Sequence, residues 1–403
     1  MDDASSGDDG GDGSLDPSSF DSVVSDPLFS KDQSRVGIPR QWYLFDPLQR
    51  SRNIFADIRA PEAWSFFGGH CSEFVHIIVI DEFAKNKHLD LSYDDPEAKT
   101  GSGNLIDIFE FENQSADIKT YLGSAAWVRG NATAGGEHGT HVSGTIAAVG
   151  DNGYGVTGVC QRARLISAGG IRTDGAGTTA SVVRAFEAGL KLSELVAKRD
   201  GIDPANIRRV YNMSYSAVAP VGLKADPELD FIQTHPEILF VAAAGNSSRD
   251  LDAPKATESE FPAAWSYIKR QDVLEETPNL LAVGATNRSA ALTGYSNRGS
   301  KRVEIAAPGG SYATVSSEGI AYGSTITNLD SGGDGDRVTS IAGTSMSTPV
   351  VTGVAALVWS RCPSLTAAQL KDLLISKADA RTNLAKIAGQ RFLNLERAVK
   401  ECR

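Results

Sequence analysis

The chain has 403 residues, 41% of them hydrophobic and 22% charged, which is typical of a globular protein with one large or two modest domains. Its formal net charge is −11, but residues 1–26 hold eight Asp and no Lys, Arg or Glu, so residues 27–403 are nearly balanced, with 39 bases and 42 acids. This balance, with no basic cluster and no apolar run of roughly 18 residues, argues against a nucleic-acid partner and a membrane span.

The opening MDDASSGDDGGDGSLDPSS is mostly Asp, Gly and Ser and offers little apolar surface to bury. We therefore predict an acidic disordered tail over residues 1–25 and one folded domain over residues 26–403. The tail lacks the basic start and the apolar stretch of an export signal. The sequence thus predicts a chain that is intracellular or that is given without its leader.

From Cys71 onward, short apolar runs alternate with longer amphipathic stretches, as in βαβ units. The expected strands are apolar almost throughout, as in a sheet buried on both faces: FVHIIVID, RARLISAGG, IRRVYNMS, EILFVAAAG and NLLAVGAT. The expected helices are 181–199, 349–361 and 366–378, the last with Thr366 as N-cap. The alternation predicts an α/β fold with a mostly parallel sheet. Residues 92–136 interrupt it, and we expect loops around a short strand there.

The four cysteines, Cys71, Cys160, Cys362 and Cys402, are scattered and match neither a dense disulfide framework nor a zinc-ligand pattern. Cys362 and Cys402 bracket the last segment and are candidates for a disulfide. Unpaired buried thiols are an equally weighted alternative.

The stretch GTSMSTPVVTGVAALV, residues 343–358, places Ser345 shortly before a Pro and a helix of small residues. A Ser in the first turn of a helix lies where backbone N–H groups and the helix dipole favour an anion, which suits a hydroxyl that attacks a carbonyl. The alternative is that Thr344 or Ser345 only caps the helix.

Two histidines, His138 and His141, lie three residues apart at an expected helix start, in EHGTHVSGTIAA. The zinc-binding helix pattern has its histidines four residues apart, so one His acting as a general base is favoured over metal binding. Asn246, after the expected strand in VAAAGNSS, is either a turn residue or an amide donor to a developing oxyanion. Asp81 ends the apolar run of VIDEFAKNKHLDL and either orients a histidine or only closes a strand.

Together these motifs resemble those of the subtilisin-like serine proteases, or subtilases, through VID, HGTHVSGT, AAAGN and GTSMSTP. The chain order Asp, His, Ser is also that of the subtilisin triad. The resemblance covers nearly all of residues 26–403 and implies a three-layer αβα fold with a mostly parallel sheet. It also implies a serine endopeptidase that hydrolyses peptide bonds through an acyl-enzyme.

By position, the resemblance implies Asp81, His138 and Ser345 as the catalytic triad and Asn246 as the side-chain donor of the oxyanion hole. His138 then removes the proton of the Ser345 hydroxyl, while Asp81 fixes the imidazole tautomer. His141, one turn further along, is expected to be a packed structural residue.

The chain departs from the family pattern directly after Asp81, where subtilases typically have a small residue and Gly but Glu82 and Phe83 stand here. Phe83 is expected either to pack away under the sheet or to crowd His138. The departure keeps an alternative function open, a catalytically silent subtilase that binds peptides in the same cleft.

The resemblance further implies a cleft in which an extended peptide lies between two chain segments. The matching positions are Gly175, Ala176 and Gly177 in one segment and Ser214, Tyr215 and Ser216 in the other. Ser216 stands where subtilases commonly have Gly, so the pocket for the residue before the cut is expected to be narrower or more polar. The alternative is that residues 214–216 are only a strand end.

The stretch GDNGYGVTGV, residues 150–159, resembles the subtilase calcium loop. The implied ligands are the Asn152 side chain, the carbonyls of Gly150, Tyr154 and Val156, and the Asp90 carboxylate, with Asp26 or Gln41 as a further ligand. The alternative is a turn rich in Gly and Asn that holds no ion. SGGDGDR, residues 331–337, lacks the last Glu of an EF-hand loop and is expected to be a polar turn.

The resemblance also sets expectations for partners and location. It implies a polypeptide substrate, an inhibitory propeptide, a monomer and structural calcium as the cofactor. Most subtilases act outside the cell, so a secreted protein is expected although the sequence shows no signal peptide.

Overall fold

The computed structural model describes residues 26, 41–85, 88, 90–91, 105–106, 136–153, 155–220, 226–253, 257–270, 273–311, 326–329 and 338–402. The predicted tail over residues 1–25 and the predicted polar turn over residues 331–337 lie outside these ranges. Most of the segment 92–136 and the predicted calcium ligand Tyr154 also lie outside them.

A nine-stranded sheet forms the middle layer, in the order β14-β15-β11-β10-β6-β4-β1-β3-β2. Its strands are β1 (Val75–Asp81), β2 (Leu105–Ile106), β3 (Arg164–Gly169), β4 (Arg208–Met213), β6 (Ile238–Ala243), β10 (Leu280–Thr286), β11 (Ile305–Pro308), β14 (Asp379–Ala380) and β15 (Arg391–Phe392). Neighbours pair in parallel except β14 with β15. Strands β1, β6, β10 and β11 are buried at every residue, which explains their mostly apolar sequences.

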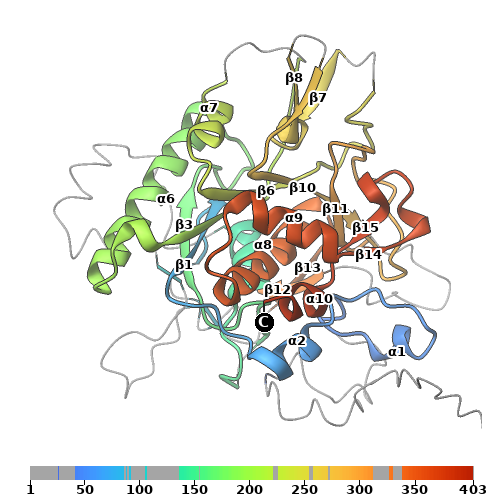
Figure 1. Ribbon diagram of the computed structural model, residues 1–403, viewed down its shortest axis with the longest axis horizontal. Coiled ribbons are helices and arrows are strands. Elements are labelled where there is room, and N and C mark those ends of the chain that lie inside the picture. Colours follow the sequence, from blue (N-terminus) through green and yellow to red (C-terminus); the bar gives the residue numbers. More distant parts are fainter. Residues whose placement is uncertain are drawn as a thin grey trace, which may run out of the picture.

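Helices cover both faces of this sheet, so the predicted three-layer αβα architecture is confirmed (Figure 1). The helices are α1 (Pro47–Arg50), α2 (Ala60–Phe67), α5 (Glu137–Ala147), α6 (Thr179–Arg199), α7 (Pro227–Thr234), α8 (Thr344–Arg361), α9 (Ala367–Lys377) and α10 (Leu395–Lys400). One core layer contains α5 and α8 and the opposite layer contains α6 and α7. Three two-stranded sheets are formed by β5 (Ala217–Pro220) with β7 (Glu258–Phe261), β8 (Tyr267–Arg270) with β9 (Val273–Glu276), and β12 (Ile326–Leu329) with β13 (Val338–Ile341).

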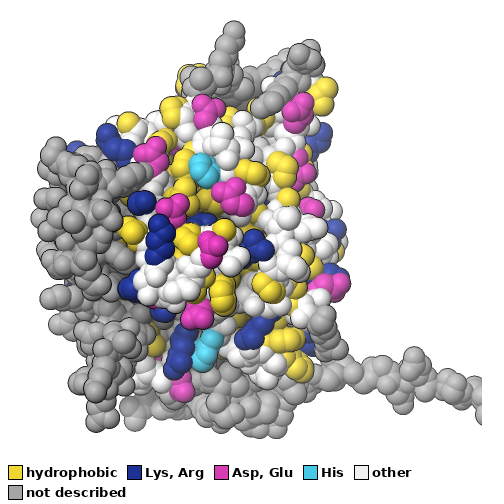
Figure 2. Space-filling model, turned by 60° about the vertical axis from the view of Figure 1, so that its left-hand side comes forward, with side chains coloured by type: hydrophobic (Ala, Val, Ile, Leu, Met, Phe, Trp, Pro, Cys, Tyr) yellow, Lys and Arg dark blue, Asp and Glu magenta, His cyan; other side chains and the backbone are white. Residues whose placement is uncertain are grey.

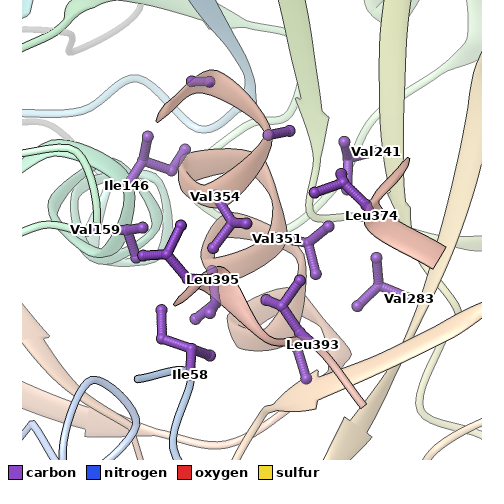
Figure 3. Packing of buried hydrophobic residues seen from close by; sticks show 14 of the residues in the cluster. Ile58, Ile146, Val159, Val241, Val283, Val351, Val354, Leu374, Leu393 and Leu395 are labelled. Atoms are coloured by element: carbon purple, nitrogen blue, oxygen red, sulfur yellow. The ribbon is translucent and has the colours of Figure 1, made fainter. Parts of the chain in front are cut away.

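Helix α8 is the central helix of its layer and is buried almost all round. A helix that is apolar on every side is characteristic of a protein interior rather than of a surface. Figure 3 shows Val354 on the side of Ile146 and Val159, and Val351 on the side of Val283. A Cβ on Gly353 would lie 2.6 Å from Cβ of Val159, so only glycine permits this approach. The start of α8 is therefore held firmly against the sheet and α5.

The helix predictions hold with one shift in position. Helix α6 begins close to its predicted start and is capped by Thr178, and Thr366 caps α9 through a reciprocal pair with Gln369. Helix α8 begins at Thr344, five residues before the predicted start, because Pro349 lies inside the helix instead of at its first turn.

Two disulfides join distant parts of the chain. The predicted pair Cys362–Cys402 is bonded, with a Cα–Cα distance of 5.2 Å, and it ties the end of α8 to the end of α10. The second bond, Cys71–Cys160, spans 89 residues and was not predicted. The alternative of unpaired thiols is thus wrong in this structure.

The surface of the described residues is mixed in chemical character on the face that Figure 2 shows. None of the described helices is both long and apolar enough to cross a membrane. On the face that Figure 2 shows, acidic and basic side chains are interspersed with hydrophobic ones, and neither sign gathers into a stripe.

Candidate active site

The predicted site residues converge on one edge of the sheet. Strands β1 and β6 both run parallel to β4, so their carboxyl ends lie at the same edge. Asp81 is the last residue of β1, and Asn246 follows the end of β6. In open α/β sheets this edge is where ligands bind.

Asp81 and His138 form the closest pair at this edge. The His138 Nδ1 atom lies 2.8 Å from Asp81 Oδ1 and 3.0 Å from Oδ2. The Asp81 carboxylate is buried and also accepts the Glu82 backbone N–H at 2.7 Å, while the His138 side chain remains one-third exposed. Burial alone lowers the pKa of His138, but the charge and hydrogen bond of Asp81 outweigh it, so the pKa is raised. The imidazole thus has one nitrogen held by a carboxylate.

Ser345 is the second residue of α8 and is half-buried. Pro349 has no N–H to donate to the Ser345 carbonyl four residues earlier, which leaves that oxygen free for another donor. The Ser214 hydroxyl takes this role at 2.9 Å. Ser214 in turn accepts from Asn212 at 2.9 Å, and Asn212 accepts from Thr352 at 2.9 Å. A polar chain from β4 therefore fixes the backbone of Ser345.

Asn246 has its side-chain oxygen fully engaged. Its Oδ1 accepts from the Thr344 N–H at 2.9 Å and from the Thr344 hydroxyl at 3.0 Å. The Nδ2 atom faces the start of α8: a Cβ built on Gly343 would lie 3.5 Å from Nδ2 and 3.7 Å from the Ser345 nitrogen. Two N–H donors therefore border one small volume, which glycine at position 343 leaves open.

The structure does not join all of these residues by direct bonds. Among the described residues, no hydrogen bond links Ser345 to His138. Hydrogen bonds between nucleophile and base are often long before a substrate is bound, so this geometry is compatible with their acting together. His141 is fully buried on α5, as expected for a structural residue.

The two predicted substrate segments follow β3 and β4, the strands on either side of β1. Gly175, at φ +78°, lies in an exposed turn that precedes α6. The Tyr215 hydroxyl donates to Glu228 of α7, and burial raises the pKa of Glu228 to about 7 although the hydrogen bond from Tyr215 opposes the rise. Both segments thus border the edge at which Asp81 lies.

In the predicted pocket, the Ser216 hydroxyl donates a hydrogen bond to Glu260 Oε1 at 2.7 Å. Glu260 lies on β7 and is buried. Its other oxygen accepts from Asn297 at 2.7 Å, and Arg249 Nε lies 4.0 Å away. A Cβ on Gly245, at φ +98°, would come within 2.2 Å of Oε1. Glu260 could not be predicted as a site residue, because it lies 44 residues from Ser216 and belongs to no local motif.

Of the predicted calcium ligands, the structure brings Asp26, Asp90, Asn152 and Val156 together, while Tyr154 lies outside the described residues. The buried Asp90 carboxylate accepts from Asn152 Nδ2 and from the Val156 N–H, each at 2.9 Å. The Asp26 carboxylate accepts the N–H groups of Asp151 and Asn152 at 2.9 and 3.0 Å. Burial raises the pKa of Asp26 to about 6 despite these bonds. Two buried carboxylates beside an amide are hard donors of the type that calcium accepts. Among the described residues, however, no three His, Cys, Asp or Glu side chains are grouped so that they could hold a metal ion.

Gln41 is tied to the same loop. Its side chain accepts the Thr157 N–H at 3.0 Å and donates to the Thr157 carbonyl at 2.7 Å. Both polar ends of Gln41 therefore pair with the backbone of Thr157.

Comparison with known proteins shows the family of the chain. The model of the subtilase family matches residues 74–393. Subtilisin DY of Bacillus licheniformis is 31% identical over 289 residues, which cover 70% of this chain and 85% of that protein. The chain therefore belongs to the subtilase family, and its relatives support a serine protease activity.

Solved structures show the same fold. A cold-adapted subtilisin-like serine proteinase matches with a TM-score of 0.54 and 24% identity, over 81% of this chain and 90% of that one. A protease from Pseudoalteromonas arctica matches with a TM-score of 0.63 and 21% identity, over 95% of this chain and 100% of that one.

Phe83 packs away from His138. A Cβ on Gly169 would lie 2.3 Å from the Phe83 ring, and Phe83 belongs to the core layer of α6, on the opposite face of the sheet from α5. Of the two expectations for this residue, the first is confirmed: the ring fills the space that Gly169 leaves beneath the end of β1.

Replacing Phe83 should therefore affect stability and not turnover. Phe83→Ala is expected to lower the free energy of unfolding by about 3–5 kcal/mol, measured by urea denaturation. Cleavage per folded molecule should stay within about twofold of wild type. Phe74→Ala, at a half-exposed ring just before β1, is the control and should cost about 1 kcal/mol or less. Unchanged stability with altered turnover would place the ring against His138 instead.

Proposed function

We propose that this subtilase is a serine endopeptidase in which Asp81, His138 and Ser345 form the catalytic triad. The observation that carries the proposal is the pair of contacts from His138 Nδ1 to the buried Asp81 carboxylate. It leaves Nε2 as the nitrogen that takes a proton, and Ser345 lies at the start of the adjacent helix, α8. Asn246 completes the proposed site as a donor of the oxyanion hole.

The chemistry follows from these positions. His138 Nε2 takes the proton of the Ser345 hydroxyl as its oxygen attacks the peptide carbonyl, and the Asp81 carboxylate stabilises the imidazolium. The carbonyl oxygen becomes an oxyanion that accepts from the Ser345 N–H and Asn246 Nδ2. His138 then gives its proton to the leaving amine, and water hydrolyses the acyl-enzyme by the same route. Because Thr344 occupies Asn246 Oδ1, the amide presents its donor side to the oxyanion without rearrangement.

The alternative is a catalytically silent subtilase that holds peptides in the same cleft. This alternative arose because Glu82 and Phe83 replace the small residue and Gly that subtilases typically have. Phe83, however, packs in the core layer of α6 and away from the site. The required residue types are present and Asp81 is bonded to His138, which favours the enzyme.

A fluorophosphonate probe tests this choice directly. Wild type should be labelled on Ser345, Ser345→Ala should not be labelled, and Asn246→Ala should be labelled and turn over peptide about 10²–10³ times more slowly, the loss known for this donor in subtilisin. Ser347→Ala serves as the matched control, because Ser347 is buried and donates to the Ala307 carbonyl at 3.0 Å; it should still be labelled. A folded wild type that resists the probe would favour the silent form, and equal labelling of Ser345→Ala would move the nucleophile elsewhere.

The pocket for the residue before the cut is proposed to lie between residues 214–216 and Gly245. Both segments flank Ser345, through the Ser214 bond and through Asn246. The Glu260 carboxylate contacts both and forms a buried anionic floor, with Arg249 at 4.0 Å offsetting part of its charge. We propose that this pocket accepts Lys or Arg better than a bulky aromatic residue.

A panel of peptides that differ only in the residue before the cut tests the pocket. Wild type should give a higher kcat/KM with Lys or Arg than with Phe, and Glu260→Gln should reduce that ratio on the order of tenfold, because the buried countercharge is lost. Glu258→Gln, on the same strand but half-exposed, should change the ratio little. A preference for Phe in wild type, or a ratio that Glu260→Gln does not move, would contradict the proposal.

We propose calcium as a structural ion of the loop at residues 149–157. Asp90 and Asn152 would hold it with their side chains, together with the carbonyls of Gly150, Tyr154 and Val156 and with Asp26. The ion would neutralise two buried carboxylates that accept N–H groups of the loop. It takes no part in the peptide chemistry.

Chelation tests the calcium proposal. EGTA should lower Tm, since an ion at a hundredfold excess over its Kd adds about 2.7 kcal/mol to the free energy of unfolding. Asp90→Asn should lose most of this calcium-dependent shift, whereas Asp230→Asn, exposed on α7, should keep it. An unchanged Tm in EGTA would mean that the loop holds no ion.

For location and partners we propose a secreted monomer that acts on polypeptides and is made with an inhibitory propeptide. The two disulfides support an oxidising compartment, where such bonds form and persist. The propeptide and the monomer are proposed by analogy with the family.

A further inference from the structure

Glu82 lies where the structure joins the end of β1 to the start of α5. Its side chain is buried, and its Oε2 atom accepts the backbone N–H of His138 at 3.1 Å. The nearby N–H of Gly139 also favours the charged form of this carboxyl group. The N-cap residue of α5 is Gly136, which has no side chain to accept these donors. Glu82 therefore supplies, from another segment, the cap that the helix lacks.

The surrounding backbone is shaped to this side chain. A Cβ on Gly136 would lie 2.0 Å from Glu82 Oε2, and a Cβ on Gly139 would lie 2.0 Å from the Glu82 carbonyl oxygen. Neither position tolerates a larger residue while Glu82 stays in place. The contact thus fixes the distance between the end of β1, which carries Asp81, and the first turn of α5, which carries His138.

The charges around Glu82 come from both elements. Asp81 on β1 and His138 on α5 face it, and Glu137 stands beside His138 on the same helix. Burial raises the pKa of Glu82, with a further contribution from Asp81, while His138 and the helix N–H groups lower it. The negative charges of Asp81, Glu82 and Glu137 all raise the pKa of His138, against the lowering effect of burial.

We infer that Glu82 is a positioning residue for the proposed triad: its carboxylate holds the first turn of α5 so that the His138 ring meets Asp81, and its charge stabilises the imidazolium. The inference rests on the proposed function. It assigns a role to the residue at which this chain departs from the family pattern, and the role is helpful to the reaction rather than obstructive.

The direction of the pH effect follows from the chemistry. His138 acts as a base only when neutral, so kcat/KM rises with pH through the pKa of His138 in the free enzyme. Glu82 raises that pKa. Removing its charge should therefore move the acidic limb of the pH profile to lower pH and lower the plateau rate, because the imidazolium is less stabilised.

Glu82→Gln separates charge from hydrogen bonding, since the amide oxygen still accepts the His138 N–H. The acidic limb of kcat/KM should move by about 0.5–1 pH unit to lower pH. The matched control is Glu137→Gln, an exposed acid in the first turn of the same helix that accepts from Thr339 at 3.1 Å; it should move the limb much less. Glu82→Asp, which keeps the charge but is shorter, should keep the limb near wild type and lower Tm.

An NMR titration of the His138 ring in a Ser345→Ala background gives the same pKa without relying on activity. If fluorophosphonate labels wild type but Glu82→Gln moves neither the His138 titration nor the acidic limb, the inference is wrong and the proposed function stands. If the probe fails to label wild type while Glu82→Gln still lowers the His138 pKa, the proposed function is wrong and the link between Glu82 and His138 stands. Should Glu82→Gln fail to fold, Glu82→Asp decides: a limb that moves as far as 0.5 pH unit would contradict a role through charge.

Discussion

The burial of α8 is the constraint on which the rest of the structure depends. A helix with apolar contacts on every side cannot rotate or slide without losing packing on one of them. Its first turn is therefore fixed relative to β6, and Thr344 transmits this to Asn246 through two hydrogen bonds. The hydroxyl of Ser345 and the amide of Asn246 thus owe their relative placement to apolar packing several turns away.

Polar groups at the site are arranged around local interruptions of regular structure. Pro349 breaks one hydrogen bond inside α8, and the freed carbonyl of Ser345 accepts from Ser214 instead. Gly343 leaves space beside two N–H donors. At α5 the missing cap is supplied by Glu82. In each case a regular hydrogen bond, side chain or helix cap is missing, and a polar group near the site takes its place or is left accessible. Such local irregularities are common at functional sites.

The parts of the structure that could be predicted from the sequence are those with a local, repeated signal. The five predicted strands match β1, β3, β4, β6 and β10 closely because nearly complete burial makes their sequences mostly apolar. The candidate site residues could be picked out because four short motifs carry them. The contacts of Glu82 with His138 and of Ser216 with Glu260 could not be predicted, because they join residues 56 and 44 positions apart that follow no period. The Cys71–Cys160 bond escaped prediction for the same reason.

The side chains of the two residues after Asp81 each occupy the space beside a glycine, where a Cβ would otherwise lie. Glu82 fills the space that Gly136 leaves, and Phe83 fills the space that Gly169 leaves. Restoring the small residue and Gly typical of subtilases at positions 82 and 83 would open two voids, and enlarging either glycine alone would create a clash. Positions 82 and 136, and positions 83 and 169, are therefore free to change only together, so an evolutionary path between this chain and its relatives has to pass through coupled substitutions.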